Sequence, residues 1–175
     1  PRSESGRTFE VVAPDGAFLA NAALASRKDV RDAVVAARAA QPGWAGATAF
    51  NRGQVLHRIA ELVEGRRGQF IDELRAHGAD EHAAAHEVDV TVDRLIWYAG
   101  WTDKFAQIAG SVNPVAGPFF NVSVPEPIGV VAVIAPQASA LLGLVSVVAP
   151  ALVGGNTVVV VASQQRPLPA VSLTE

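Results

Sequence analysis

The sequence predicts an incomplete α/β fold, in which amino-terminal helices precede a parallel βαβ unit. Residues 128–135 and 157–161 are continuous apolar runs, which are typical of strands buried on both faces of a parallel sheet. Leu141–Leu152 between them has helical length, and Gly154-Gly155-Asn156 is expected to end it. Two parallel strands are fewer than a sheet normally has, so we expect the 175 residues to form one incomplete domain.

The first 110 residues are expected to be mainly helical, with a leading β-hairpin. Residues 9–13 and 17–21 are short runs around Pro14-Asp15-Gly16, a sequence typical of tight turns. Ser26, followed three positions later by Asp29, predicts a capped helix N-terminus. That helix is expected to end at Pro42-Gly43 and to bury one stripe, formed by Val30, Ala33, Val34 and Ala37.

Three more helices are predicted before residue 110. One begins near Thr48, a shorter one ends at Gly78, and the last runs from about Glu81 to Ile108. Their apolar stripes are expected to be Leu56, Ile59, Ala60 and Val63; then Phe70, Ile71 and Leu74; then Val92, Leu95, Ile96 and Ala99. His57 and His77 lie among charged residues and are expected at the surface.

The composition changes after residue 110. Ser111–Pro118 is rich in glycine and proline and predicts a connection, whereas Phe119–Val124 is rich in aromatic and β-branched residues and predicts a strand. Residues 128–161 then form the βαβ unit.

Composition excludes several classes of protein. The net charge of −3 is spread without basic blocks, which argues against a nucleic-acid partner, and the absence of cysteine excludes disulfides and a cysteine nucleophile within the chain. Pro1–Arg7 is polar and unlike a secretory signal, so we expect a cytoplasmic location. The uncharged stretch 127–165 is broken by proline and glycine and is expected to lie in a core, not a membrane.

Several segments, in this order and spacing, resemble the aldehyde dehydrogenase superfamily. The resemblance covers nearly the whole chain and implies the amino-terminal part of an aldehyde-dehydrogenase-like Rossmann-type domain. The strand at 119–124 would then belong to the arm through which subunits pair. The segments are Ala39–Trp44, Asn51-Arg52, Tyr98–Trp101, Glu126–Val131, Ala149–Leu152 and Gly155–Val159.

The same resemblance indicates that the catalytic positions have changed. Where the family usually reads Pro-Trp-Asn, with an asparagine amide that stabilises the oxyanion, this chain reads Pro136-Gln137-Ala138. A methyl group cannot donate a hydrogen bond, and the loss of one such donor typically costs about 10²–10³ in rate. The family's catalytic cysteine and its acid–base glutamate would lie beyond residue 175.

The cofactor positions are also altered. Where the family usually reads Lys-Pro-Ser-Glu and holds NAD or NADP, this chain reads Val161-Ala162-Ser163-Gln164. The lysine charge is absent at Val161, although Gln164 retains the capacity to bind a hydroxyl. The resemblance therefore implies a cofactor site at Pro136, Gln137, Val161, Ser163 and Gln164 whose binding has been weakened or lost.

Other motifs carry weaker predictions. His82 and His86 have the i, i+4 spacing of metal ligands, but no third ligand is evident, so a solvated first helical turn is the favoured interpretation. Ser139 lacks the sequence of a nucleophile elbow. Gly154-Gly155 precedes a strand and is expected to be a helix stop, not a phosphate loop.

Two functions remain open from the sequence. The first is a catalytically inactive module that resembles the non-catalytic second module of two-module aldehyde dehydrogenases and acts in assembly, as a homo-oligomer or with another aldehyde-dehydrogenase-like chain. The second is the dinucleotide-binding fragment of an active NAD(P)-dependent aldehyde dehydrogenase, completed by a further segment.

Overall fold

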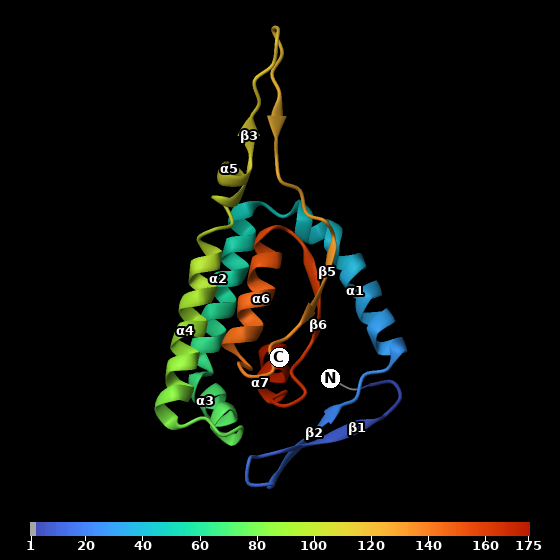
Figure 1. Cartoon of the computed structure of the whole chain (residues 1–175), viewed down its shortest axis with the longest axis vertical. Helices are drawn as coiled ribbons and strands as arrows, with labels where there is room; N and C mark the ends of the chain where they lie inside the picture. Colours follow the sequence, from blue (N-terminus) through green and yellow to red (C-terminus); the bar gives the residue numbers. More distant parts are fainter. Residues whose placement is uncertain (1–2) are drawn as a thin grey trace.

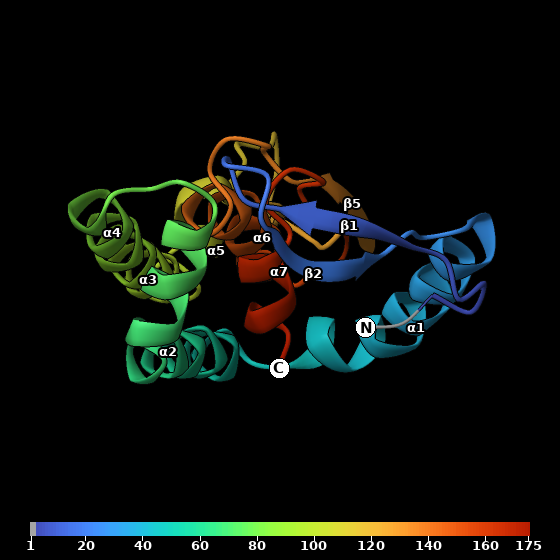
Figure 2. The ribbon, with the colours of Figure 1, turned by 90° about the horizontal axis from the view of Figure 1, so that it is seen from below.

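The computed structural model describes residues 3–175, so Pro1 and Arg2 of the predicted non-signal segment lie outside the described residues. The helices labelled α2, α4 and α6 lie on one side of the small parallel sheet of β5 and β6, and α1 lies on the opposite side (Figures 1 and 2). The elements are β1 (Thr8–Val12), β2 (Phe18–Ala23), α1 (Arg27–Gly46), α2 (Ala49–Gly65), α3 (Arg67–Ala76), α4 (Glu81–Ala99), α5 (Phe105–Ala109), β3 (Ser111–Val112), β4 (Val122–Ser123), β5 (Val130–Ile134), α6 (Leu142–Val153), β6 (Thr157–Val161) and α7 (Leu168–Leu173).

The predicted hairpin and helix cap are both present. β1 and β2 pair antiparallel, and the turn between them places Gly16 at a φ of 87°, which explains why glycine follows Asp15. At the start of α1, the Ser26 hydroxyl accepts from the backbone N–H of Asp29, and the Asp29 carboxylate accepts from the N–H of Ser26. This reciprocal capping box satisfies two N–H groups that the helix itself leaves free.

Helix α1 departs from prediction in two ways. It continues past Pro42 to Gly46, because the Trp44 indole N–H donates to the Leu152 oxygen at 3.1 Å and anchors the last turn to the end of α6. The predicted stripe is not buried either, since Val34 and Ala37 are half-buried and Val30 is 47% exposed. The helix packs against both strands of a two-stranded sheet, which is too narrow to cover the whole stripe.

Helices α2, α3 and α4 form the main core with α6. The predicted apolar residues of α2 and α3 are buried or half-buried. The close approach of α2 to α4 depends on Gly53, since a Cβ at that position would lie 2.7 Å from the Thr102 hydroxyl oxygen. The inner face of α4 comprises Ala84, Val88, Thr91 and Leu95, so the prediction that Ile96 lies inside is wrong.

The predicted fourth helix is two helices. α4 ends at Ala99, where the Thr102 hydroxyl donates to the Ala99 oxygen at 2.9 Å, and a turn separates it from the short α5. Gly100 and this side-chain cap stop a helix that the apolar pattern alone would continue to Ile108.

The predicted βαβ unit is present. β5 and β6 pair in parallel over their full length, from Val130 opposite Thr157 to Ile134 opposite Val161, and α6 connects them. At the amino ends of the strands, the Thr157 hydroxyl donates to the Ala37 oxygen and the Asn156 side chain accepts from the N–H of Gly129. These bonds fix α1 and the start of β5 against β6.

The two strands are less buried than predicted. Ala132 and Val161 are exposed, and Ile134 is 79% exposed. The two strands form a sheet of their own within the described residues, so each strand has one unpaired edge, and α1 and α6 cover the sheet only in part. The continuous apolar runs therefore predicted the two strands correctly, but the expectation that both of their faces are buried is wrong.

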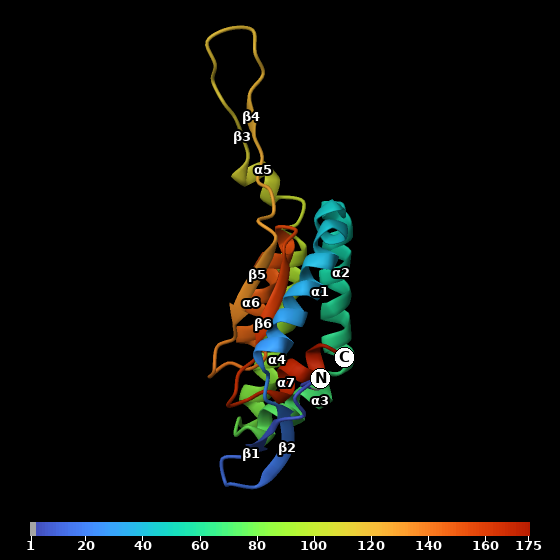
Figure 3. The same ribbon diagram turned by 90° about the vertical axis from the view of Figure 1, so that its right-hand side faces the viewer.

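Residues 111–123 form an arm that projects from the body (Figures 1 and 3). Of the strand expected at Phe119–Val124, only β4 is formed. It pairs antiparallel with β3, which lies inside the segment predicted to be a connection. Pro114, Gly117 and Pro118 interrupt the ladder, because proline has no N–H to donate and Gly117 adopts a φ of 128°.

Among residues 3–175, the helices are too short or too polar to cross a bilayer; the most apolar, α6, has 12 residues.

Candidate functional site

The candidate site lies at the carboxyl ends of β5 and β6. Two loops follow these strands, residues 136–141 after β5 and residues 162–167 after β6, and we call the two loops together the rim. Ligands of open α/β sheets commonly bind at the carboxyl ends of parallel strands. The rim contains every candidate cofactor residue of the sequence analysis except Val161, which is the last residue of β6.

Gln137 and Ser163 join the two loops of the rim. The Ser163 hydroxyl donates to the Gln137 side-chain oxygen at 3.0 Å, with the Gln137 backbone oxygen at 3.3 Å. The same side-chain oxygen accepts from the backbone N–H groups of Gln164 at 3.1 Å and Gln165 at 3.4 Å. Ser163 is buried, and its hydroxyl also accepts from the N–H of Arg166. Both side chains are therefore occupied by contacts within the protein.

Arg166 is the charged residue of the rim, and it is not among the site residues predicted from the sequence. Its guanidinium donates to the backbone oxygen of Ala138 at 2.8 Å, so it reaches from the loop after β6 to the loop after β5. The only available signal was its place in the sequence, five residues after Val161 in a segment that follows a parallel strand. The rim thus carries a cation, although at a different position from the lysine that the resemblance implied.

The remaining rim residues have few groups that could bind a ligand or take part in a reaction. Pro136, Ala138 and Gln164 are exposed, as is Val161 at the end of β6. The side chains of Pro136, Ala138 and Val161 are apolar, so they cannot donate hydrogen bonds to a reacting oxygen or a phosphate. The polar groups that the rim presents to a ligand are the exposed amides of Gln164 and Gln165 and the guanidinium of Arg166.

Glu87 of α4 holds the start of α6 beneath the rim. Its Oε1 accepts from the backbone N–H groups of Leu141 at 3.2 Å and Leu142 at 3.1 Å, and from the Ser139 hydroxyl at 3.1 Å. The Ser139 oxygen in turn accepts from the N–H of Gly143 at 2.8 Å. A carboxylate at a helix N-terminus is favoured by the free N–H groups and by the helix dipole. Ser139 is therefore part of a helix cap.

The remaining candidates are the pair His82 and His86 and the glycines that precede β6. His82 and His86 are exposed on α4, and within residues 3–175 no group of three potential metal-ligating side chains is present. Gly155, with a φ of 80°, follows the end of α6, as the helix-stop interpretation predicted.

His77 is buried, so the expectation that it lies at the surface is wrong. Only 5% of the residue is exposed, and its Nε2 has no hydrogen-bond partner within the described part of the chain. Burial lowers the pKa of His77 and the positive charge of Arg166 lowers it further, whereas Glu73 raises it. His77 closes the end of α3, where Gly78 turns the chain toward α4.

Comparison with known proteins gives a consistent result at the level of sequence. Residues 2–175 match the model of the aldehyde dehydrogenase family. Retinal dehydrogenase 2 of Mus musculus is 37% identical over 174 residues, which cover 96% of this chain and 33% of the relative. Mitochondrial aldehyde dehydrogenase of Equus caballus is 35% identical over 172 residues, which cover 95% of this chain and 34% of the relative.

Solved structures also superpose closely on this chain. The structure of PnpE in complex with nicotinamide adenine dinucleotide superposes with a TM-score of 0.95 at 31% identity, covering 100% of this chain and 36% of that one. The NAD⁺ complex of an aldehyde dehydrogenase from Bacillus cereus gives a TM-score of 0.93 at 30% identity, covering 99% of this chain and 36% of that one. The chain spans about a third of the length of the relatives that it matches.

Proposed function

The chain belongs to the aldehyde dehydrogenase family, and on this premise we propose that it is a module that acts in assembly and does not oxidise aldehydes by itself. The observation that carries the proposal is the composition of the rim, where an exposed methyl group at Ala138 occupies the position implied for an oxyanion donor. The exposed apolar surface of the arm and the unpaired sheet edges supply the means of assembly.

Aldehyde oxidation requires a nucleophile that adds to the carbonyl carbon and donors that stabilise the resulting oxyanion. The 175 residues include no cysteine, and the Gln137 amide nitrogen, a possible donor, donates to the Ala135 backbone oxygen at 3.4 Å. Bound NAD or NADP would supply the hydride acceptor for such a reaction. At the rim, Gln164, Gln165 and Arg166 are the groups suited to contact it, which is a small set for a dinucleotide.

The purified chain should therefore produce no NADH or NADPH when an aldehyde and either oxidised cofactor are added. Ala138→Asn should remain inactive as well, because an oxyanion donor has no effect without a nucleophile. Turnover by the unmodified chain above that of a heat-treated control would overturn the proposal of inactivity.

The surface for assembly centres on the arm. Phe119 is 74% exposed and Phe120 is 82% exposed, and Val124 and Ile128 near the base of the arm are exposed as well. Clustered apolar surface of this kind is typical of interfaces, and unpaired edges of a sheet favour pairing with another chain. We propose that the arm binds another aldehyde-dehydrogenase-like chain, in the simplest case a second copy.

Sedimentation velocity over a range of concentrations tests this assignment. The chain should associate, and Phe119→Ser combined with Phe120→Ser should shift it toward the monomer. Phe50→Ser is the matched control, because Phe50 is 69% exposed but belongs to α2 and not to the arm. A compact monomer at every concentration, or an equal effect of the control, would contradict an assembly role for the arm.

A second candidate, the dinucleotide-binding fragment of an active NAD(P)-dependent aldehyde dehydrogenase, is favoured by one observation. Arg166 places a guanidinium at the rim between the loops that follow β5 and β6, and guanidinium groups bind phosphate well. If this candidate is correct, the chain should bind NAD or NADP, and Arg166→Gln should weaken that binding by about tenfold or more. Equal affinity of the variant would remove the observation that favours it.

A further inference from the structure

One polar stripe of α3 holds the residues that follow β6. We call residues 162–175, which comprise the second loop of the rim and α7, the post-β6 segment. The hydroxyl of the buried Ser172 donates to the Glu73 Oε1 at 2.5 Å. The Gln69 amide donates to the same carboxylate oxygen at 2.9 Å and to the Ser172 hydroxyl at 3.1 Å, and the Arg66 guanidinium donates to the Ser172 backbone oxygen at 2.7 Å. Three side chains on one helical face therefore fix a single residue of α7.

The same stripe carries two buried polar atoms without a partner. Glu73 uses its Oε1 for both contacts with the stripe and α7, whereas its Oε2 is buried and unpaired within residues 3–175. His77 follows one helical turn later, and its Nε2 is also buried and unpaired within that range. Buried polar atoms normally have partners, because leaving them unpaired costs free energy. The pair is therefore a place where a change of charge would be felt.

Two charged groups act on His77 from the elements around it. Burial lowers the pKa of His77, the positive charge of Arg166 in the second loop of the rim lowers it further, and Glu73 of α3 raises it. The turn of the β1–β2 hairpin, which approaches the end of α3, carries Asp15, and the start of α4 carries Asp80. Neither of these two carboxylates contributes to the shift. The two groups that do contribute both bind the post-β6 segment or belong to it.

A proton on His77 would weaken the hold on this segment in two ways. The new positive charge repels Arg166, whose guanidinium donates to the Ala138 backbone oxygen at 2.8 Å and ties the second loop of the rim to the first. The imidazolium also competes for Glu73, because an ion pair with the buried Oε2 would draw the carboxylate away from Ser172. One titrating side chain thereby affects both the loop and the helix of the segment.

We propose that His77 is a proton-sensitive switch that controls how tightly the post-β6 segment is held against α3 and the first loop of the rim. Neutral His77 leaves the segment closed, and protonated His77 opens it. Because the segment includes Ser163 and Arg166, its opening also separates the two loops of the rim. The switch requires neither the arm nor catalysis, so it goes beyond the function proposed above.

The direction of the switch follows from proton linkage. In the closed segment His77 is buried and its pKa is lowered, whereas in the open segment it takes up a proton near the ordinary value of about 6.5. The closed form is therefore fully favoured above about pH 6.5, and opening becomes more frequent as the pH falls from there. At about pH 5.5, one unit lower, the increase amounts to at most about tenfold.

Amide hydrogen exchange of the full chain, followed by NMR at about pH 7.5 and 5.5 and corrected for the intrinsic effect of pH on exchange, tests the proposal. The opening constant of residues 163–174 should rise by about five- to tenfold at the lower pH. This opening should be insensitive to about 1 M urea, whereas exchange at the buried Leu56 of α2 should accelerate, because local opening exposes little surface. No rise, or a rise only through urea-sensitive unfolding, would overturn the proposal.

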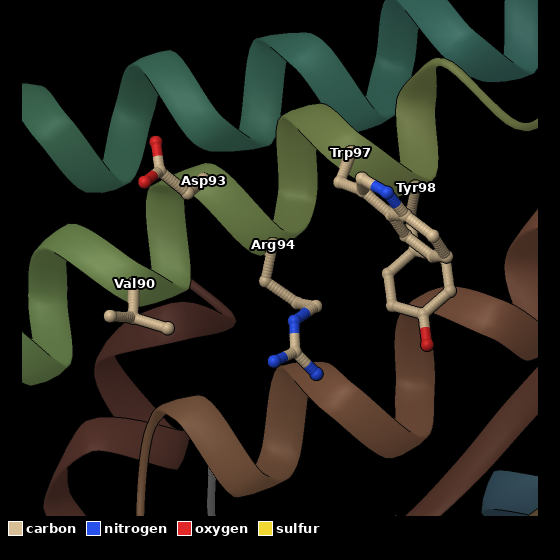
Figure 4. Close-up of a pocket in the computed structure, with 5 residues that line it drawn as sticks. All are labelled: Val90, Asp93, Arg94, Trp97 and Tyr98. Atoms are coloured by element: carbon tan, nitrogen blue, oxygen red, sulfur yellow. The ribbon is translucent and has the colours of Figure 1, made fainter.

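Variants identify the group that titrates. His77→Gln should lose the rise, whereas His82→Gln, an exposed histidine of α4, should keep it. Arg166→Gln should reduce the rise, because the charge that disfavours protonation is gone. Arg94→Gln is its matched control, since the Arg94 side chain extends from α4 toward α6 and donates to Ser146 without acting on His77 (Figure 4).

The two arginine variants leave His77 in place, so they test the switch even if His77→Gln fails to fold. A full rise in folded His77→Gln would contradict the proposal. Equal rises in Arg166→Gln and Arg94→Gln would contradict it as well.

Discussion

Ser163 and Gln137 lie 26 positions apart in the sequence, yet the Ser163 hydroxyl donates to the Gln137 side-chain oxygen at 3.0 Å and joins the loops that follow two parallel strands. That oxygen also accepts from two backbone N–H groups of the second loop. One side chain therefore organises the carboxyl end of the small sheet. It is one of the residues that the family resemblance implies for cofactor binding, but its oxygen serves the protein itself.

Gln137→Ala should separate the two loops of the rim. The substitution leaves the Gln164 N–H without its acceptor and leaves the Ser163 hydroxyl only the Gln137 backbone oxygen at 3.3 Å, so the free energy of unfolding should fall by about 1–2 kcal/mol. Amide hydrogen exchange at Gln164 and Gln165 should become faster. Gln165→Ala is the control, because the Gln165 side chain is exposed and only its backbone contacts Gln137; a loss of stability as large as that of Gln137→Ala would contradict this role.

Glu87→Ala should destabilise the start of α6. It removes the acceptor of two backbone N–H groups and of the Ser139 hydroxyl, and we expect the free energy of unfolding to fall by about 2–3 kcal/mol. Glu87→Gln keeps an oxygen acceptor and should lose less. Denaturant unfolding measures both variants. Asp93→Ala on the same helix should change stability little, and similar losses for Glu87→Ala and Asp93→Ala would argue against a specific cap.

Gly53→Ala should destabilise the chain although alanine favours helices. The new methyl group would lie 2.7 Å from the Thr102 hydroxyl oxygen and 3.1 Å from the Ala99 oxygen, so α2 and α4 would have to separate. We expect a loss of about 1–3 kcal/mol in thermal or denaturant unfolding. At Gly68 of α3 no neighbouring atom lies within 4 Å, and Gly68→Ala should stabilise by about 0.5–1 kcal/mol. A gain at both positions would show that the two helices are not in close contact.

The stability of the chain should depend on pH through His77. Burial and Arg166 lower the pKa of His77 in the folded chain, whereas the unfolded chain takes up the proton near the ordinary value of about 6.5. The stabilisation by neutral His77 is therefore complete above about pH 6.5 and is lost as the pH falls from there through the folded pKa. Glu73 opposes part of this shift.

Thermal unfolding between about pH 7.5 and 5 measures this effect. His77→Gln should show a shallower fall in Tm than the unmodified chain, and the exposed His82→Gln should retain the original slope. Identical slopes for His77→Gln and the unmodified chain would show that burial of His77 does not contribute to the pH dependence.

The elements that could be predicted from the sequence are those whose signals are local. The capping box at Ser26, the turn at Gly16 and the apolar runs of β5 and β6 each depend on a few neighbouring residues, and each element is present. The wrong boundaries depend on distant contacts. Helix α1 continues through Pro42 because Trp44 binds the end of α6, and the helix predicted to reach Ile108 stops at Ala99 because Thr102 caps it.

The residues of the candidate site could be listed from the sequence, but their partners could not. The pattern around Gln137 and Ser163 does not indicate that the two side chains are engaged with each other, nor that Arg166 reaches the Ala138 oxygen. His77 illustrates the same limitation, since its charged neighbours in the sequence suggest the surface, whereas the turn at Gly78 and the packing of α3 bury it.

Calorimetric titration of the chain with NAD and with NADP tests the central claim most directly, because the claim is that the rim has lost most of the groups that would hold a dinucleotide. The account predicts no saturable binding up to about 1 mM of either cofactor, since Val161 offers no charge and Ser163 and Gln137 are engaged with each other. Saturable binding with a Kd of about 10 µM or below, abolished by Ser163→Val, would contradict it.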